Sequence, residues 1–156
     1  MVIGRILSPV HSLGPGERVA VWTKGCSRGC EGCISPELQS FSGDETDEAA
    51  LAGIVKHVAA VKGCNGLTVS GGDPFEQSGA LYRFLERVRD SFEDILVYTG
   101  YSLQEIEEGG AGAAGEKCLG LIDVLIDGPY IAALNRPDCV LRGSSNQVIH
   151  FRDPEK

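Results

Sequence analysis

The sequence lacks long apolar runs. No stretch approaches the roughly 18 residues that a membrane-spanning helix needs, and the N-terminal segment MVIGRILSPVHS has no apolar core of a secretory signal. Both absences predict a cytoplasmic chain without a membrane partner. An excess of positive charge is also missing, since 14 Lys and Arg residues stand against 22 Asp and Glu residues and the net charge is −8. Because phosphate contacts dominate nucleic-acid affinity, this balance argues against a nucleic-acid partner.

No block of like charges suggests disorder, and 42% of the 156 residues are hydrophobic. A chain of this length can bury a substantial core. At about 100–200 residues per domain, residues 1–156 are expected to form a single domain.

Three of the six cysteines lie within eight residues, in the stretch WTKGCSRGCEGCISPE at positions 22–37. Cys26, Cys30 and Cys33 each follow a glycine, and glycine lets backbone amides approach a ligand closely. Three thiolates can therefore surround one metal or cluster. Four would complete a zinc site or saturate a four-iron cluster, whereas three leave a position open, as catalytic metal centres do. The stretch thus predicts a reactive metal centre.

Two other interpretations of these cysteines remain. They could be buried or disulfide-bonded in a tight loop, although three thiols cannot all pair, or they could bind zinc together with a distant residue. The isolated cysteines are expected to be small core residues, and the histidines are assigned no role. These residues are Cys64, Cys118, Cys139, His11, His57 and His150.

Segments typical of strands alternate with segments typical of helices. Strands are predicted at 2–10 (an edge strand broken by Pro9), 19–23, 67–70, 95–98, 123–127 and 147–151. Helices are predicted at 47–61 and 76–90 from apolar residues at i, i+3, i+4 and i+7, and Ser102 with Glu105 forms a capping box that begins a short helix. The glycine-rich segment 109–115 is predicted to be a mobile loop.

This alternation predicts an α/β fold with a mostly parallel sheet. A complete eight-stranded barrel needs about 250 residues, so the chain is expected to form a partial, laterally open (β/α) barrel of about five to six strand-helix units. Polar or glycine-rich strand ends would then line one face. They are Gly25, Ser70, Thr99, Asp127 and the turn at Ser144.

The segment Ser70-Gly71-Gly72-Asp73-Pro74 follows a predicted strand. Two consecutive glycines expose backbone groups that can contact a small ligand. The alternative is a strand-to-helix turn with Asp73 as the N-cap and Pro74 as the first helical residue. Asp127 has the same two interpretations, contact with substrate or cofactor, or a cap or turn.

The Cys-x3-Cys-x2-Cys stretch resembles that of the radical S-adenosylmethionine (radical SAM) enzymes, and Gly71-Gly72-Asp73-Pro74 resembles the segment that binds the cofactor's methionine amino group in that family. The resemblance implies that Cys26, Cys30 and Cys33 bind three irons of a 4Fe-4S cluster whose fourth iron binds S-adenosylmethionine. It also implies that Gly32, Cys33 and Ile34 pass beside the adenine. The further residues implied in cofactor binding are Ser70, Gly71, Gly72, Asp73, Thr99 and Asp127.

More landmarks resemble the glycyl radical activating enzymes, above all those of anaerobic (class III) ribonucleotide reductase. They are Gly14-Pro15-Gly16 with Arg18, where Leu13 replaces an aspartate, then Tyr98-Thr99-Gly100-Tyr101, Asp127-Gly128-Pro129 and the segment 142–147, RGSSNQ. The resemblance implies reductive cleavage of S-adenosylmethionine and removal of a hydrogen atom from a glycine of the partner reductase. It implies an external electron donor such as flavodoxin or ferredoxin and no acid-base residue.

Two other functions stay open. The motifs specify the cofactor better than the hydrogen donor, so the substrate could be another peptide or a small metabolite. The chain could also be a non-catalytic iron-sulfur carrier or a zinc module. A partial barrel cannot exclude water and stray hydrogen donors by itself, which favours a protein substrate that closes the site.

Overall fold

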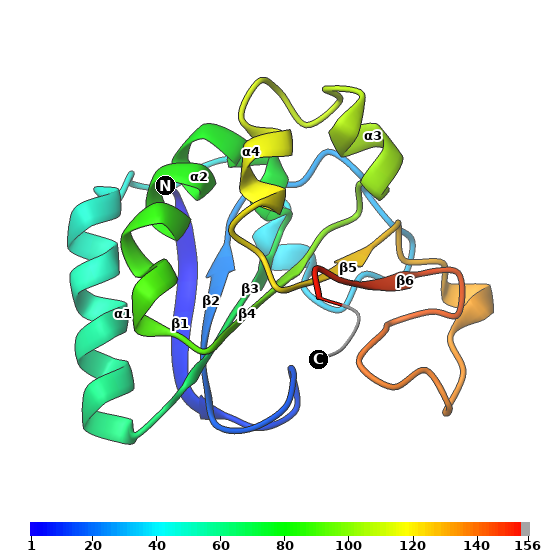
Figure 1. Ribbon diagram of the computed structural model, residues 1–156. Helices are drawn as coiled ribbons and strands as arrows, with labels where there is room; N and C mark the ends of the chain where they lie inside the picture. Colours follow the sequence, from blue (N-terminus) through cyan, green and yellow to red (C-terminus); the bar gives the residue numbers. More distant parts are fainter. Residues whose placement is uncertain (154–156) are drawn as a thin grey trace.

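The computed structural model describes residues 1–153, and six strands of this range form one sheet in the order β1-β2-β3-β4-β5-β6 (Figure 1). The strands are β1 (Ile3–Val10), β2 (Arg18–Thr23), β3 (Gly66–Gly71), β4 (Asp94–Tyr98), β5 (Val124–Asp127) and β6 (Val148–Phe151). Strands β2 to β5 pair in parallel. This confirms the predicted open, mostly parallel sheet, while β1 and β6 pair antiparallel at its two edges.

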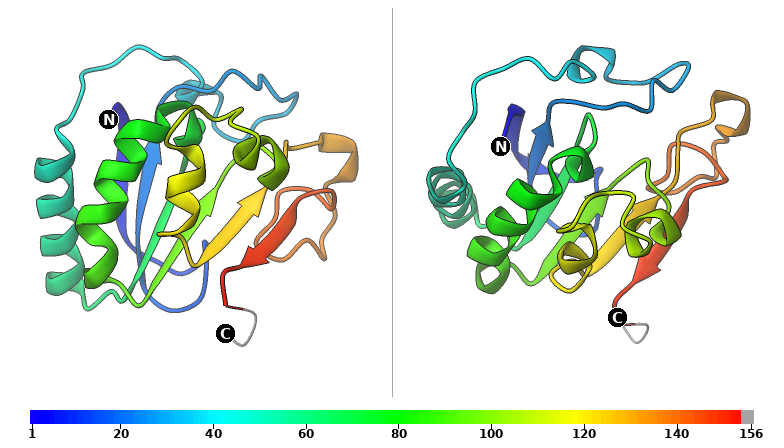
Figure 2. Two further views of the ribbon diagram at one scale, coloured as in Figure 1. Left: turned by 45° about the horizontal axis from the view of Figure 1, so that its top comes forward. Right: turned by 90° about the horizontal axis from the view of Figure 1, so that it is seen from above.

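Helices cover one face of the sheet (Figures 1 and 2). They are α1 (Glu48–Lys62), α2 (Ser78–Val88), α3 (Leu103–Glu107) and α4 (Gly115–Leu119). Short 3-10 helices lie in the connections: η1 (Pro36–Leu38), η2 (Pro74–Gln77), η3 (Arg89–Ser91) and η4 (Ala132–Leu134). The side chain of Asp47 caps α1 by accepting the N–H groups of Ala49 and Ala50. The predicted capping box of Ser102 and Glu105 begins α3. Helix α4 was not predicted, because five residues are too few to show a helical period.

Alternating side chains divide the central strands between two environments. Val19 and Val21 of β2, Val69 of β3 and Val97 of β4 are fully buried in one core cluster with residues of α1 and α2. Their neighbours of opposite parity point to the other face, which the helices leave uncovered. That face is therefore available for a cavity.

A buried arginine joins the N-terminal ends of three strands. Arg18, at the start of β2, is 1% exposed. Its guanidinium donates to Thr68 Oγ1 (2.7 Å), to the carbonyl oxygens of Leu67 (2.7 Å) and Pro15 (2.9 Å), and lies 2.8 Å from a carboxylate oxygen of Asp94. The resemblance included this arginine among its landmarks. The structure places it at the end of the strands opposite the cysteines, where it stabilises the sheet.

Two predicted irregular segments are well defined in the structure. Strand β1 continues through Pro9, which follows a cis peptide bond, and its register shifts between Leu7 and Val10. The glycine-rich segment 109–115 forms turns, and Ala111 within it is buried against the core. Its mobility stays a prediction. Within residues 1–153, none of the helices has the length and apolar character needed to cross a membrane.

Candidate functional site

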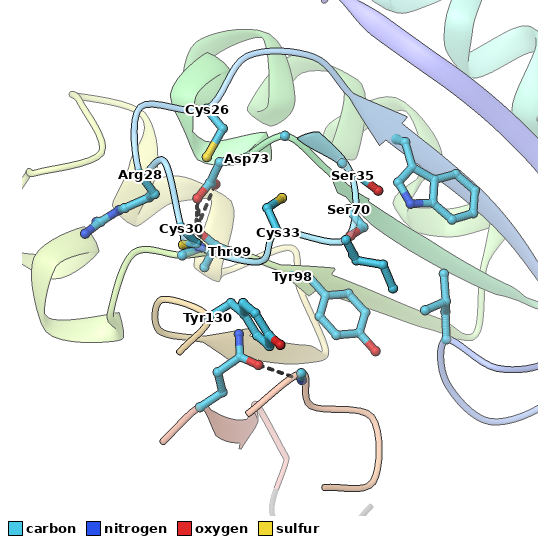
Figure 3. A pocket seen from close by; sticks show the side chains of 18 of the residues that line it. Cys26, Arg28, Cys30, Cys33, Ser35, Ser70, Asp73, Tyr98, Thr99 and Tyr130 are labelled. Carbon is cyan, nitrogen blue, oxygen red and sulfur yellow. Dashed lines mark hydrogen bonds between the residues drawn. The ribbon is translucent and has the colours of Figure 1, made fainter. Parts of the chain in front are cut away.

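A cavity of about 900 Å³ lies on the face of the sheet that the helices do not cover (Figure 3). Its walls come from the cysteine loop (residues 24–35), the ends of β3 and β4, strand β1, and the β5–β6 connection (residues 128–147). Ten of the residues predicted to bind cluster or cofactor line it: Cys26, Cys30, Gly32, Cys33, Ile34, Ser70, Gly71, Gly72, Asp73 and Thr99. The sheet thus brings these predicted residues together.

The cysteine loop is held by its backbone. The N–H of Gly25 donates to the carbonyl of Leu38 (2.8 Å), and the N–H of Cys26 donates to that of Gln39 (3.0 Å). The carbonyl of Gly25 accepts the N–H of Asp73 (2.8 Å). The loop is therefore attached both to η1 and to the segment after β3. None of the six cysteines forms a disulfide, so the disulfide-bonded alternative is wrong.

The surroundings of the thiols fit an iron-sulfur cluster. Burial raises the pKa of Cys26, while the backbone N–H groups of Arg28 and Gly29, which hydrogen-bond its sulfur, oppose this shift. Gly29 has a φ of 57°, and a backbone with successive N–H groups around such a residue forms the type of concavity that surrounds Fe–S clusters. Figure 3 shows all three cysteine side chains at the cavity.

The side chains available at the cavity fit a cluster better than a single metal ion. Within residues 1–153, no three or more His, Cys, Asp or Glu side chains gather closely enough to hold one metal ion. A cluster binds its thiolates through separate irons, so they are spread around its centre. The cavity lining contains no further cysteine and no histidine. The one carboxylate of the lining, that of Asp73, already accepts groups of Phe75, Thr99 and Gly100. The donor set of three thiolates therefore fits a cluster with one open iron better than it fits zinc.

The paired glycines allow β3 to lie against the cysteine loop. At Gly71, with φ +124°, a Cβ would lie 2.3 Å from the backbone nitrogen of Thr23. At Gly72 it would lie 2.4 Å from the carbonyl oxygen of Gly25 and 2.6 Å from that of Leu38. We expected these glycines to allow close approach of a ligand. The structure shows close approach of the protein's own backbone, although both residues also line the cavity.

Asp73 is the N-cap of η2, with Pro74 in its first turn, as the alternative interpretation predicted. Its buried carboxylate accepts the N–H of Phe75 (3.0 Å), the hydroxyl of Thr99 (2.8 Å) and the N–H of Gly100 (2.8 Å). Burial raises its pKa to about 6, against the opposing effect of these hydrogen bonds. Asp73 and Thr99 therefore connect the ends of β3 and β4 at the cavity wall.

Asp127 is turned away from the cavity. Its carboxylate accepts the N–H of Leu103 at the start of α3 and lies 3.2 Å from Nε2 of His150 on β6. Asp127 is not among the residues that line the cavity. The geometry gives Asp127 a structural contact with the start of α3 rather than cofactor contact, although the N-cap of α3 is Ser102 and not Asp127. It also places His150, which had no predicted role, beside this carboxylate.

Ser27 and Arg28 attach the loop to two further segments. The N–H of Ser27 donates to Glu76 of η2 (2.8 Å), whose same oxygen also accepts the Ser27 hydroxyl. Nη2 of Arg28 lies 3.1 Å from both carboxylate oxygens of Glu105, and its guanidinium lies 4.2 Å from the centroid of the Tyr101 ring. These contacts could not be predicted from the sequence, because nothing local connects Arg28 with a residue 77 positions away.

Part of the cavity wall consists of residues for which no role was predicted. Arg5 pairs with Trp22 across β1 and β2 and stacks over its ring at 4.9 Å, and Trp22 is level with Ser70 on β3. Tyr98 of β4 lines the same wall, where burial raises its pKa to about 12. The period-2 alternation of the strands was the available signal, since these residues share parity with Ser70 through the sheet register.

The RGSSNQ segment holds the β5–β6 connection in place. Oε1 of Gln147 accepts the N–H groups of Gly143 (2.7 Å) and Ser144 (3.2 Å), and its Nε2 donates to the carbonyl of Gly128 (2.9 Å). Asn146 donates to the carbonyl of Pro129 (2.8 Å). These hydrogen bonds hold in place the part of the cavity wall that faces the cysteine loop. The residues of this part that line the cavity are Tyr130, Arg142, Gly143 and Gln147.

Comparison with known proteins agrees with this geometry. The family model described as "4Fe-4S single cluster domain" matches residues 12–150. The chain is 36% identical over 145 residues to the anaerobic ribonucleoside-triphosphate reductase-activating protein of Haemophilus influenzae, covering 88% of this chain and 89% of that protein. It is 33% identical over 143 residues to the protein of that name from Escherichia coli K12 (88% and 90% covered), and 32% over 140 residues to that of Enterobacteria phage T4 (86% and 83%).

Proposed function

We propose that this chain activates an anaerobic ribonucleoside-triphosphate reductase as a radical SAM enzyme. The chain belongs to the 4Fe-4S single cluster domain family and to the anaerobic ribonucleoside-triphosphate reductase-activating proteins. One observation of this structure supports the proposal in addition to family membership. Cys26, Cys30 and Cys33 face one cavity at the carboxyl ends of parallel strands, and no fourth cysteine or histidine lines it.

The proposed cofactors are a 4Fe-4S cluster and S-adenosylmethionine. When bound, a reduced cluster supplies one electron for reductive cleavage of S-adenosylmethionine, which leads to loss of a hydrogen atom from a glycine of the reductase. The chain's own residues supply binding, orientation and exclusion of water. The three thiolates would hold three irons, and the backbone N–H groups at Cys26 would stabilise their negative charge.

The rest of the cavity wall would hold S-adenosylmethionine. Ser70, Gly71 and Gly72 expose backbone beside the cysteine loop, and Asp73 with Thr99 keeps this edge in place. On the other side, Gly32, Cys33 and Ile34 would pass beside the adenine. Ile34 is 97% exposed, so its apolar side chain is available to a ring. Asp127 is left out of the proposed site, because its carboxylate accepts the N–H of Leu103 of α3 and lies beside His150 of β6.

The proposed substrate is a protein. The cavity lies on an uncovered face of a six-stranded sheet that does not close into a barrel, and a site for radical chemistry must exclude water. A glycine-bearing loop of an anaerobic (class III) reductase would close it. Glycine suits this role because it lets the loop pass close to the cofactor. An external donor such as flavodoxin or ferredoxin would supply the electron. We propose that residues 1–156 act as a single domain in the cytoplasm.

The test is anaerobic reconstitution followed by reduction in the presence of S-adenosylmethionine. We expect about four irons per chain, formation of 5′-deoxyadenosine, and a glycyl radical signal on a class III reductase from the same genome. Alanine at Cys26, Cys30 or Cys33 should abolish all three. The matched controls Cys64→Ala and Cys118→Ala should retain them.

The outcomes separate the alternative functions. Cleavage of S-adenosylmethionine without a radical on the reductase would favour a different peptide or a small metabolite as substrate. A chain that binds zinc, or that holds a cluster but never forms 5′-deoxyadenosine, would be a structural module or an electron carrier.

A further inference from the structure

Arg28 of the cysteine loop forms an ion pair with the carboxylate of Glu105. Arg28 lies between Cys26 and Cys30, and Nη2 of its guanidinium bonds both oxygens of Glu105 at 3.1 Å. It also stacks on Tyr101 at 4.2 Å. The Arg28 side chain is 23% exposed and that of Glu105 45% exposed. A two-oxygen contact combined with ring stacking fixes a guanidinium in a way that a lysine cannot reproduce.

Glu105 is held where it meets Arg28. It occupies the third position of α3, where its carboxylate also accepts the N–H of Ser102 (2.7 Å). This backbone hydrogen bond, with Arg28 as a further cause, lowers the pKa of Glu105, so the side chain is ionised at neutral pH. The next residue after the cap, Leu103, is bound to Asp127. The start of α3 is therefore a rigid platform for the anion.

Two carboxylate residues are attached to the loop beside Cys26. Glu76 accepts the N–H of Ser27 (2.8 Å), and the N–H of Asp73 donates to the carbonyl of Gly25 (2.8 Å). An unpaired Arg28 would offset the negative charge of these carboxylates, whereas the pair of Arg28 and Glu105 contributes no net charge. The loop is thus attached to α3 by an arginine without becoming electropositive.

We propose that Glu105 neutralises Arg28, so that the arginine fixes the cysteine loop without raising the reduction potential of the cluster. The proposal rests on the function proposed above. A cluster on three thiolates gains one negative charge when it accepts the donor's electron, so an unmatched cation nearby would favour the reduced form and raise the potential. A low potential favours onward transfer of the electron. Arg28 and Glu105 are positioning residues in this proposal, since they act through the loop.

The deciding variant is Glu105→Gln. Glutamine is accepted at the third position of a capping box, so the variant removes the charge and keeps the start of α3. The control is Glu107→Gln, which removes the same charge from an exposed position of the same helix. The measurement is the midpoint potential of the reconstituted protein by anaerobic spectroelectrochemical titration, without S-adenosylmethionine or reductase. We expect a more positive potential for Glu105→Gln than for Glu107→Gln.

The reciprocal variant is Arg28→Met, which leaves Glu105 unmatched and should shift the potential in the negative direction, with faster loss of iron. If this variant fails to load, Arg28→Lys keeps the charge without the two-oxygen contact and should lose iron faster at a potential near that of the wild type. Equal potentials for the two glutamate variants, or a negative shift for Glu105→Gln, would overturn the proposal. A loaded cluster with the expected shifts but no 5′-deoxyadenosine would instead contradict only the proposed function.

Discussion

Replacement of Gly72 by alanine tests how the cysteine loop is supported. The φ of Gly72 is not in the left-handed region, so alanine brings no backbone strain of its own. The new Cβ would instead lie 2.4 Å from the carbonyl oxygen of Gly25 and 2.6 Å from that of Leu38. Since a relaxed C···O contact is about 3.3 Å, the backbones must separate by about 0.8 Å.

This separation pulls on two hydrogen bonds of the loop, Gly25 N–H to Leu38 O and Asp73 N–H to Gly25 O, both 2.8 Å long. Overpacking against rigid groups costs about 1–3 kcal/mol, and each weakened hydrogen bond adds about 1 kcal/mol. We therefore expect Gly72→Ala to reduce the free energy of unfolding by about 3–5 kcal/mol. At this chain length the melting temperature should fall by about 6–20 °C.

The assay compares thermal unfolding of the cluster-free protein with iron content after anaerobic reconstitution. Gly72→Ala should lower both, because the displaced backbone carries Cys26. The matched control is Gly53→Ala in α1, where a Cβ meets nothing within 4 Å, and alanine there should stabilise the helix by about 1 kcal/mol. A Gly72→Ala protein with wild-type melting and iron content, and reduced affinity for S-adenosylmethionine alone, would refute this reasoning. The glycine would then serve the ligand rather than the loop.

Three further variants test other parts of the structure. Arg18→Ala leaves Asp94 without its buried partner and should cost about 3 kcal/mol in urea unfolding; a loss below about 0.5 kcal/mol would show that the arginine does not join the strands. The folded-state pKa of Asp73 is about 6, above its ordinary value of 3.8. Below pH 4 the protonation of Asp73 therefore stabilises the folded chain, and this stabilisation is lost as the pH rises through 6. The stability of the cluster-free wild type relative to Asp73→Asn should therefore fall by about 2 kcal/mol between pH 4 and 7, and a constant difference would contradict the shift. Asp127→Ala should speed hydrogen exchange at Leu103 by removing its acceptor, whereas reduced affinity for S-adenosylmethionine with unchanged exchange would return Asp127 to the cofactor site.

The helices and strands could largely be predicted from the sequence, because their signals are local. The apolar spacing of residues 47–61 and the capping box of Ser102 and Glu105 both lie within one element, and both appear in the structure. The short helix α4 has too few turns for a period, so it escaped prediction. The cysteine spacing was also local, and it predicted a cluster that the family match supports.

The roles of single site residues depended on contacts between distant parts of the chain. Gly72 is required by Gly25 and Leu38 rather than by a ligand, and Asp127 is bound to Leu103 rather than exposed in the cavity. No local pattern distinguishes these alternatives. A glycine after a strand and an aspartate at a strand end look the same in the sequence whichever neighbour they meet.

Sheet register decided which residues share the cavity wall. Arg5, Trp22, Ser70 and Tyr98 come from four strands and lie on one face because of how these strands pair. A slip of one residue in any strand would turn its side chains to the opposite face. Arg28 and Glu105 are 77 residues apart in the chain. They meet only because β4 and α3 pack beside the cysteine loop. By itself the sequence determined the elements and the thiolate donors; the tertiary structure decided their partners, because pairing across the sheet is a property of register and packing rather than of local spacing.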